Sequence, residues 1–456
     1  MANAKLARVE LPDFGMPTRM PELPAHLYQA RLDRLRELAE SRDLDAMVVY
    51  ADREHSANLS YLTGFDPRFE EALLVVGKDP EPAILVGNEC WGMAGNAPLR
   101  MRLHRFQEFS LPSQPRDKSR SLPAILADEG IGPGTRVGVV GWKSFADRAL
   151  TDIPSYLADA IRELTDGEIE NATDLLIDPG AGLRVINELE QLVIFEYASC
   201  ATSSGVRRLL FGLEPGLTEQ QAVRLLEWNG MPLSCHLMLT AGPRAALGLL
   251  SPSDRMIERG DPLTVAFGVW GALNCRAGFL VESADELPVA IADYVGRLVA
   301  PYFEAVVEWY QALWVGQAGG VLQEIIDRRL SDLFFGIFLN PGHQLHLDEW
   351  VNSPVWPGSP VALQSGMAMQ VDIIPATGTE YFTTNIEDGV VLADDDLRRR
   401  WASEYPESWS RIEARRVFMR DVLGIDVHDD VLPLSNIPAY LPPFLLNPEQ
   451  VMVMTG

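Results

Sequence analysis

The sequence predicts an α/β protein of two to three domains, on three observations. The chain has 456 residues, and domains usually span about 100 to 200 residues. Its composition, 47% hydrophobic and 22% charged, is typical of a globular protein with a sizeable core. Up to about residue 170, segments with helical periodicity alternate with short apolar runs, which is the pattern of an α/β domain.

Composition and charge exclude several classes of protein. No apolar run approaches the ~20 residues of a membrane-spanning helix, and the first ten residues lack the apolar core of a signal peptide. The net charge of −26 argues against nucleic acid or an anionic membrane as a partner. Four cysteines without paired spacing argue against disulfides and zinc knuckles: Cys90, Cys200, Cys235 and Cys275. We therefore expect a cytoplasmic protein.

The first part of the chain carries one clear helix and several strand signals. Residues 1–27 are rich in Pro and Met without periodicity, and we expect an arm laid over another surface. Residues 31–41 place Leu32, Leu35 and Leu38 on one face, which predicts an amphipathic helix. Apolar runs predict buried strands at residues 45–50, 72–76 and 82–86.

A domain boundary is expected at residues 178–182, where Pro and Gly cluster. This gives one domain of residues 1–178 and a second of residues 179–456. In the second domain, Thr218 and Gln221 predict a capping box at the start of a helix. Helices are predicted at residues 184–210, 289–314, 321–330, 394–400 and 409–423, and strands at 263–267, 367–374 and 386–392.

One stretch near the C-terminal end carries the candidate chemistry. His343 and His346 follow a Pro-Gly pair, and Asp372 and Glu387 each lie on an apolar run of strand type. A histidine and two carboxylates on adjacent strands would converge on one face, as in metal or acid/base sites. The alternative is structural: Asp372 ends a strand, Glu387 lies in a hairpin turn, and His343 caps a turn.

Short motifs over most of the chain resemble one known family. Two of them, at residues 44–49 and 58–65, are typical of one domain type, and six more follow in order at residues 214–219, 240–244, 259–261, 341–343, 365–367 and 386–389. Together they resemble the pita-bread fold family of creatinase, prolidase, Xaa-Pro aminopeptidase and methionine aminopeptidase. The resemblance implies an α/β (α+β) protein with a small creatinase-type N-terminal domain followed by a pita-bread catalytic domain.

The resemblance also implies part of a metal site. Metallopeptidases of this family hold two divalent ions with two aspartates, one histidine and two glutamates. His343 falls at the ligand histidine, Glu387 at the last glutamate, and Asp372 at the position of the other glutamate. Three protein ligands are enough for one catalytic metal.

The remaining family positions depart from that pattern. The two aspartate positions fall at Ala266 and Cys275, one histidine position at Leu249 or Leu250, and a partner histidine position close to Trp350. Hard divalent ions need several anionic oxygens to be held together, so without both aspartates a two-metal site should not form.

Two chemistries remain for the retained residues. One divalent metal would bind His343, Asp372 and Glu387, with Cys275 nearby. A site without a cofactor would resemble that of creatinase, with His343 or His346 as the proton carrier and Asp372 and Glu387 as base or cation anchor.

Four further side chains are candidate substrate contacts. Arg276 would contact an anion or oxyanion, and Cys275 and Trp350 occupy family site positions. His236 would face the cavity, or else is a core histidine on an apolar strand.

The N-terminal domain supplies a second candidate cluster, Phe65, Arg68 and Glu71, beside a glycine turn. The alternative is an ordinary loop. In the creatinase branch this domain of one subunit commonly covers the site of its partner. The resemblance therefore implies a homodimer in which these residues complete the partner's site.

Three functional hypotheses follow. The first is a metal-independent, creatinase-like hydrolase that cleaves an amide- or amidine-type C–N bond of a small polar molecule. The second is a mononuclear metalloenzyme, either a peptidase of Xaa-Pro type or a lyase. The third is a non-catalytic binding protein on the same scaffold, which the leucines at histidine positions favour and the retained His-Asp-Glu set disfavours.

Overall fold

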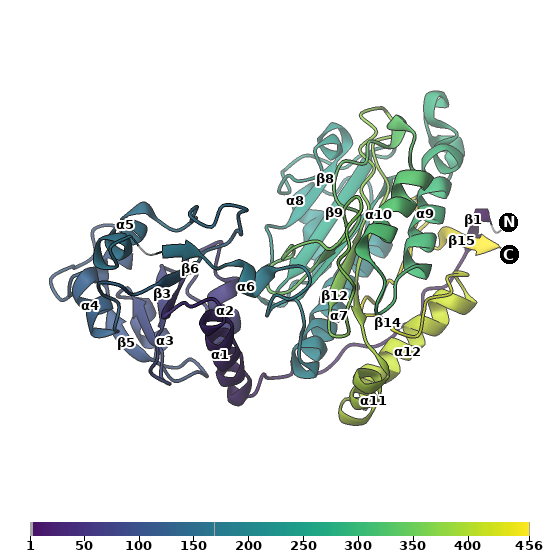
Figure 1. Ribbon diagram of the computed structural model, residues 1–456. Helices are drawn as coiled ribbons and strands as arrows, with labels where there is room; N and C mark the ends of the chain where they lie inside the picture. Colours follow the sequence, from purple (N-terminus) through teal and green to yellow (C-terminus); the bar gives the residue numbers. More distant parts are fainter. Residues whose placement is uncertain (1–2, 168, 456) are drawn as a thin grey trace. The chain divides into compact units, whose positions relative to one another are not determined.

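The computed structural model describes residues 3–167 and 169–455, which form two compact units (Figure 1). The smaller unit is residues 23–184. The larger unit joins residues 3–22 to residues 185–455. This division differs from the predicted boundary at residue 178 in one important respect, because the N-terminal arm belongs to the larger unit. The mixed α/β fold class is confirmed.

The smaller unit is built on a six-stranded sheet in the order β5-β4-β3-β2-β6-β7. Its central strands are buried along their whole length, which explains why they are continuous apolar runs in the sequence. The three strands predicted there are confirmed. The strands are β2 (Ala46–Ala51), β3 (Ala72–Val76), β4 (Ala83–Val86), β5 (Arg102–Arg105), β6 (Val137–Val140) and β7 (Ile169–Asn171). The helices are α1 (Ala25–Glu40), α2 (Ala57–Thr63), α3 (Cys90–Ala94), α4 (Leu122–Asp128), α5 (Ser155–Leu164) and α6 (Asp174–Ile177).

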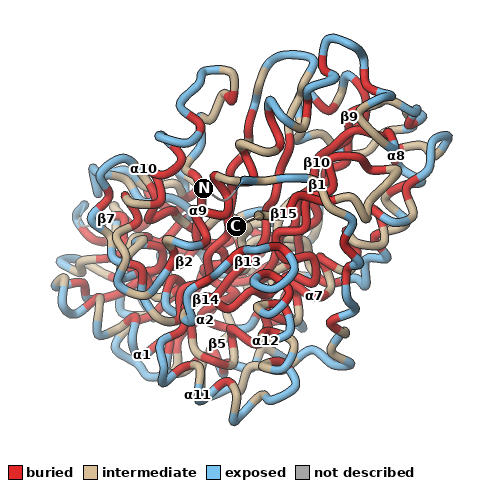
Figure 2. Tube along the Cα trace, turned by 90° about the vertical axis from the view of Figure 1, so that its right-hand side faces the viewer, coloured by how far each residue is buried: buried red, intermediate tan, exposed pale blue. Residues whose placement is uncertain are grey.

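The larger unit contains an antiparallel sheet in the order β11-β12-β13-β10-β9-β8, with β14 paired to β13. The predicted strands at residues 263–267, 367–374 and 386–392 correspond to β9, β12 and β13. The bounds are β8 (Met238–Ala241), β9 (Pro262–Val269), β10 (Ala272–Phe279), β11 (His343–Gln344), β12 (Ala368–Asp372), β13 (Asn385–Leu392) and β14 (Val431–Pro433). Figure 2 shows β9, β10 and β13 as almost continuously buried.

The two halves of this unit repeat one order of elements, two α-helices followed by three strands. The first half contains α7 (Leu189–Gly212), α8 (Glu219–Ala222) and β8 to β10, and the second contains α9 (Ala300–Gln311), α10 (Gly319–Arg329) and β11 to β13. In each half a glycine with positive φ turns the chain between the helices, Gly216 at 95° and Gly316 at 100°. The predicted capping box at Thr218 and Gln221 opens α8. Helices α11 (Asp395–Glu404) and α12 (Pro406–Asp421) follow the second half.

Helices α7 and α9 cover one face of this sheet. Thr202 of α7 donates a hydrogen bond to the Asn274 side chain on β10. The Tyr302 hydroxyl of α9 accepts from the backbone N–H of Ile386 on β13. Side chains alternate between faces along a strand, so the immediate neighbours of Asn274 and Ile386 point to the opposite face. That opposite face carries the candidate site.

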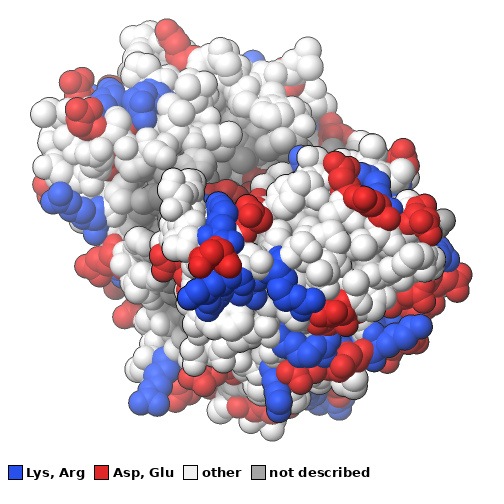
Figure 3. All heavy atoms as spheres, turned by 90° about the vertical axis from the view of Figure 1, so that its left-hand side faces the viewer, with Lys and Arg blue, Asp and Glu red and all other residues white. Residues whose placement is uncertain are grey.

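The N-terminal arm forms β1 (Asn3–Arg8), which pairs antiparallel with β15 (Gln450–Thr455), and the two ends of the chain lie together in Figure 1. Among the described residues, no helix is both long and apolar enough to cross a bilayer. On the face shown in Figure 3, basic and acidic side chains are intermingled.

Candidate functional site

Five side chains form a continuous row across the larger sheet, here called the site row. The register pairs Met238 with Ala266, Ala266 with Cys275, Cys275 with Glu387, and Glu387 with Asp372. Residues directly opposite one another on neighbouring strands project to the same face. The row is therefore apolar at one end and acidic at the other.

His343 faces the acidic end of the row. It pairs with Gln370, two residues before Asp372 on β12. The ring is fully buried, and its Nδ1 lies 3.2 Å from the carbonyl of Gln344. With Nδ1–H donating to that carbonyl, Nε2 is left to face the carboxylates.

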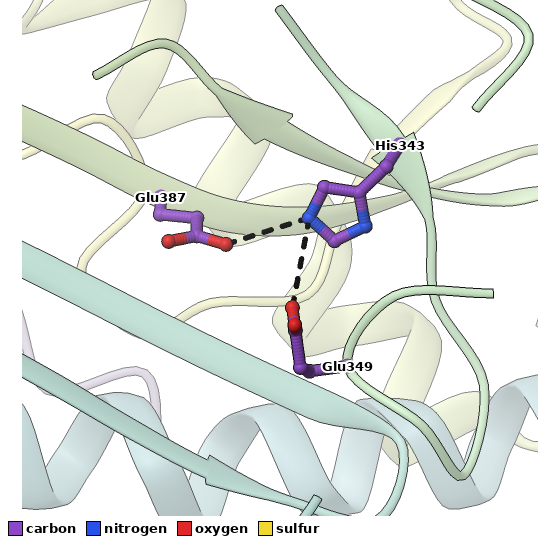
Figure 4. Close-up of side chains that lie close together, drawn as sticks. All are labelled: His343, Glu349 and Glu387. Atoms are coloured by element: carbon purple, nitrogen blue, oxygen red, sulfur yellow. Dashed lines mark ion pairs between the residues drawn. The ribbon is translucent and has the colours of Figure 1, made fainter. Parts of the chain in front are cut away.

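The carboxylates surround His343 Nε2 at similar distances. Nε2 lies 3.5 Å from Glu387 Oε1, 3.8 Å from Asp372 Oδ2 and 4.0 Å from Glu349 Oε2. Figure 4 shows Glu387 and Glu349 approaching the same nitrogen from two directions. The retained trio of His343, Asp372 and Glu387 thus comes together, joined by a residue that the sequence analysis did not identify.

That additional residue, Glu349, lies in the irregular segment after β11 and is about one third exposed. The segment is anchored by Trp350, whose ring stacks on His343 with centroids 4.2 Å apart and planes inclined by 17°. Trp350 therefore contacts the site through the histidine ring. A carboxylate next to a predicted site residue was the signal in the sequence that could have identified Glu349.

Burial and mutual repulsion raise the pKa values of the three carboxyl groups. Burial, followed by the neighbouring Glu387 charge, raises the pKa of Asp372 well above its usual range. Burial raises the pKa of Glu387 to about 7, although hydrogen bonding by Cys275 lowers it. Burial also raises the pKa of Glu349 to about 7, against the opposing effect of His343. A cation placed among the three would reverse these shifts.

The donor atoms fit one divalent cation. One atom each of His343, Glu349 and Glu387 lies within 4.8 Å of the others, and among the described residues His343 Nε2 and Asp372 Oδ1 have no hydrogen-bond partner. Adjacent ligand atoms of a tetrahedral zinc would be about 3.3 Å apart. Small side-chain movements that shorten the distances between these donor atoms would therefore allow all three to bind one ion. The predicted metal ligands were His343, Asp372 and Glu387. In the structure the closest group of donor atoms is that of His343, Glu349 and Glu387, and Asp372 lies next to it.

The other end of the site row is apolar. Ala266 and Cys275 pack with Met238 and Leu273, and Cys235 lies against them. Burial raises the pKa of Cys275 well above its usual range and that of Cys235 to about 12. Both thiols are therefore protonated at neutral pH when no metal is bound, and Cys275 lies directly beside Glu387 in the site row.

Arg276 does not reach the site, contrary to prediction, because it follows Cys275 and points to the opposite face. It is 1% exposed, and its donors are bound by the Asp388 carboxylate at 2.7 Å and by backbone carbonyls including that of Tyr440. No donor direction remains for a substrate anion. Arg276 is part of the core under α7 and α9.

The other two predicted histidines differ in their surroundings. His346 is fully buried with its ring edge-to-face on Phe195, 5.1 Å between centroids, and its Nδ1 accepts from the N–H of Leu347. The ring of His346 thus packs against α7, and its role as a proton carrier stays a prediction. His236 is exposed rather than buried in the core, and its Nε2 lies 2.7 Å from the Leu249 carbonyl.

Phe65, Arg68 and Glu71 belong to the smaller unit. Phe65 is buried in that unit, Arg68 pairs with Asp66 at 3.1 Å, and Glu71 accepts a 2.5 Å hydrogen bond from Tyr50. Burial raises the pKa of Glu71. Their role in a partner's site stays a prediction.

Comparison with known proteins identifies the class to which this fold belongs. Residues 31–165 match the Creatinase/Prolidase N-terminal domain family. Solved structures with a similar fold include dipeptidase PepE from Mycobacterium ulcerans, with a TM-score of 0.63 and 17% identity, covering 92% of this chain and 98% of that one. The prolidase from Pyrococcus horikoshii OT3 has a TM-score of 0.60 and 16% identity, and the match covers 80% of this chain and 95% of that one. The Xaa-Pro dipeptidase from Bacillus anthracis has a TM-score of 0.61 and 16% identity, and the match covers 81% of this chain and 96% of that one.

A sequence relative points in the same direction. The uncharacterized peptidase YqhT of Bacillus subtilis (strain 168) is 24% identical over 227 residues, which are 47% of this chain. The match spans 62% of that protein, less than two thirds of its length. The predicted resemblance to the creatinase, prolidase and Xaa-Pro aminopeptidase family is confirmed. The named proteins that this chain resembles are peptidases, which are hydrolases of C–N bonds.

Proposed function

We propose that this protein is a mononuclear metal-dependent hydrolase of Xaa-Pro peptidase type, acting on a small peptide-like molecule. The observation that carries the proposal is that His343 Nε2, without a hydrogen-bond partner among the described residues, faces two buried carboxylates and the partly exposed Glu349. Carboxylates this close together with raised pKa values favour a shared cation. The peptidase class is supported by the names of the similar proteins.

His343, Glu349 and Glu387 would hold the metal, with Asp372 beside them. When bound, a divalent metal supplies Lewis-acid polarisation of a carbonyl and a more acidic water. Once ionised, Asp372 would accept a proton from a reacting water at Oδ1, which has no hydrogen-bond partner among the residues described. Trp350 keeps the His343 ring oriented, and the apolar end of the site row would bind the substrate's side chain.

A metal-independent, creatinase-like hydrolase is the competing proposal. It is favoured by Ala266 and Cys275 at the two positions where the resemblance places aspartates. In that case the acidic cluster would bind an organic cation of the substrate, and His343 would carry the proton. A lyase reaction and a non-catalytic binding role stay predictions, as do the homodimer and the cytoplasmic location.

Elemental analysis of protein purified without added metal or chelator separates these proposals. We expect about one transition metal per chain in the wild type and loss of that metal in His343→Ala. The exposed His236→Ala is the matched control and should keep the metal. Hydrolysis of alanyl-proline peptides should stop on chelation and return with zinc or manganese.

The competing proposal predicts different results. Metal-free wild-type protein whose hydrolysis of amides or amidines resists chelators, and is abolished by His343→Ala, would replace the metal-dependent mechanism. Protein that neither binds metal nor hydrolyses any of these compounds would favour the binding role.

A further inference from the structure

A second row of side chains lies beside the site row, two residues further along the same strands. The register pairs Thr240 with Thr264, Thr264 with Ala277, and Ala277 with Asn385. Residues two apart on a strand share a face, so this outer row faces the same side as Glu387. It begins about 7 Å from the carboxylates, which is two residues of extended chain.

Asn385 is the unusual member of the outer row. It is 9% exposed, and its Oδ1 has no hydrogen-bond partner among the described residues. Burying an unpaired acceptor costs free energy, and buried side-chain amides are normally bonded. By contrast, the hydroxyls of Thr240 and Thr264 are 2.9 Å apart and bond to each other. The carboxamide of Asn385 is therefore the group in this row that can accept a hydrogen bond from a ligand.

Small side chains continue the sheet face from Asn385 toward the apolar end of the site row. Ala277 lies next to Asn385, and Ala266 lies two residues from Thr264 on β9. An extended chain of small cross-section could lie along this face with its polar end at Asn385. The geometry suits a peptide backbone better than a bulky ring system.

The local charge determines which polar group fits there. The charges acting on Asp372, Glu387 and Glu349 come from one another, from Asp348 and Asp388, from His343, and from Arg276 on the opposite face. Arg276 is neutralised by Asp388 at 2.7 Å. With one divalent cation bound, the three ionised carboxylates still leave a net negative charge, so a ligand carboxylate about 7 Å away would be repelled within the Debye length, whereas an amide would not.

We propose that Asn385 is a specificity-determining residue that hydrogen-bonds a neutral amide of the substrate. This rests on the proposed function and refines its substrate class. The substrate is a peptide that continues past the scissile bond as an amide, in preference to a dipeptide with a free carboxylate there. The carboxamide of Asn385 matches such a group because it offers both a donor and an acceptor.

Calorimetric titration with alanyl-proline amide and alanyl-proline tests the proposal. The wild type should bind the amide about tenfold more tightly, and Asn385→Ala should lose about 3- to 10-fold for the amide with little change for the acid. Asn229→Ala, an exposed asparagine of the same unit, should leave both affinities unchanged. Asn385→Ala should be at least as stable to urea as the wild type, since the unpaired acceptor is gone.

An unchanged amide-to-acid ratio in Asn385→Ala would overturn the proposal, as would preference for the acid or binding of neither probe. Marked destabilisation of Asn385→Ala would also overturn it, because the residue would then be structural. The titrations use protein without added metal, so the assignment of Asn385 is tested separately from metal content and hydrolysis.

Discussion

Glu387 and Asp388 are consecutive buried carboxylates on β13, and their surroundings differ completely. Asp388 points under α7 and α9, where it accepts from Arg276 at 2.7 Å, from Asn274 at 2.7 Å and from the N–H of Ala439 at 2.9 Å. Glu387 points to the other face, among Asp372, Glu349 and a single histidine. One strand thus carries a paired carboxylate on one face and a crowded one on the other.

This difference separates a structural charge from a functional one. A buried charge whose hydrogen bonds and ion pairs are all satisfied stabilises the packing around it, and removing its partner leaves a buried charge unpaired. Buried carboxylates that raise each other's pKa lower the stability of the protein and mark a site for a cation or a proton. Nothing in the two residue types distinguishes the roles; only the face of the sheet does.

The largest effect is expected on the paired face. Asp388→Ala should lower the free energy of unfolding by about 3–5 kcal/mol, because the Arg276 charge is left buried and unpaired. Urea denaturation monitored by circular dichroism measures it. Glu387→Gln is the matched control on the neighbouring residue and should not be destabilising. Equal losses from the two variants would remove the distinction between the faces.

The second effect is a pH dependence that belongs to the site face. Glu349 and Glu387 have pKa values raised to about 7 in the folded protein, above the ordinary glutamate value of 4.5. The folded state therefore binds more protons than the unfolded state between these values, and metal-free protein should lose stability as pH rises from about 4.5 to about 7. Metal affinity should rise over the same range, because the ligands must release protons.

Denaturation of the metal-free protein at several pH values checks this slope. Glu387→Gln should flatten it, since one of the titrating groups is gone. If the free energy of unfolding of Glu387→Gln changed with pH as steeply as that of the wild type, Glu387 would be ionised at all these pH values. That result would weaken the case for a cation site.

The smallest effect concerns the support of His343. Trp350→Leu keeps an apolar side chain but removes the stacked ring, and should lower metal affinity by a factor equivalent to about 0.5–1.5 kcal/mol. Competition with a chromophoric zinc chelator measures the change. Unchanged affinity would mean that backbone packing alone orients the histidine.

The sequence was informative where local pattern reflects the fold. The apolar runs at β2, β3, β4, β9 and β13, and the capping box at Thr218, could be read directly. Asp372 and Glu387 were expected to converge with His343 because they lie on strands beside it. Their direct pairing on β12 and β13 fulfils that expectation, and excludes the hairpin-turn alternative for Glu387.

Other features depended on information that the sequence does not display. Every residue of β10 is buried, so no polar alternation shows that Arg276 and Cys275 face opposite sides. Glu349 reaches the site from an irregular segment whose path is set by tertiary packing of Trp350 on His343. The pairing of β1 with β15 joins segments too distant for any local pattern to reveal.

That last pairing has a consequence for how the chain is made. The hydroxyl of Thr455 donates to the carbonyl of Asn3, 452 residues earlier, so β1 leaves the ribosome long before its partner strand exists. The smaller unit, residues 23–184, is contained within one uninterrupted stretch and can fold during synthesis. The larger unit cannot close its terminal sheet until β15 emerges, and until then β1 is an unpaired edge available to other strands.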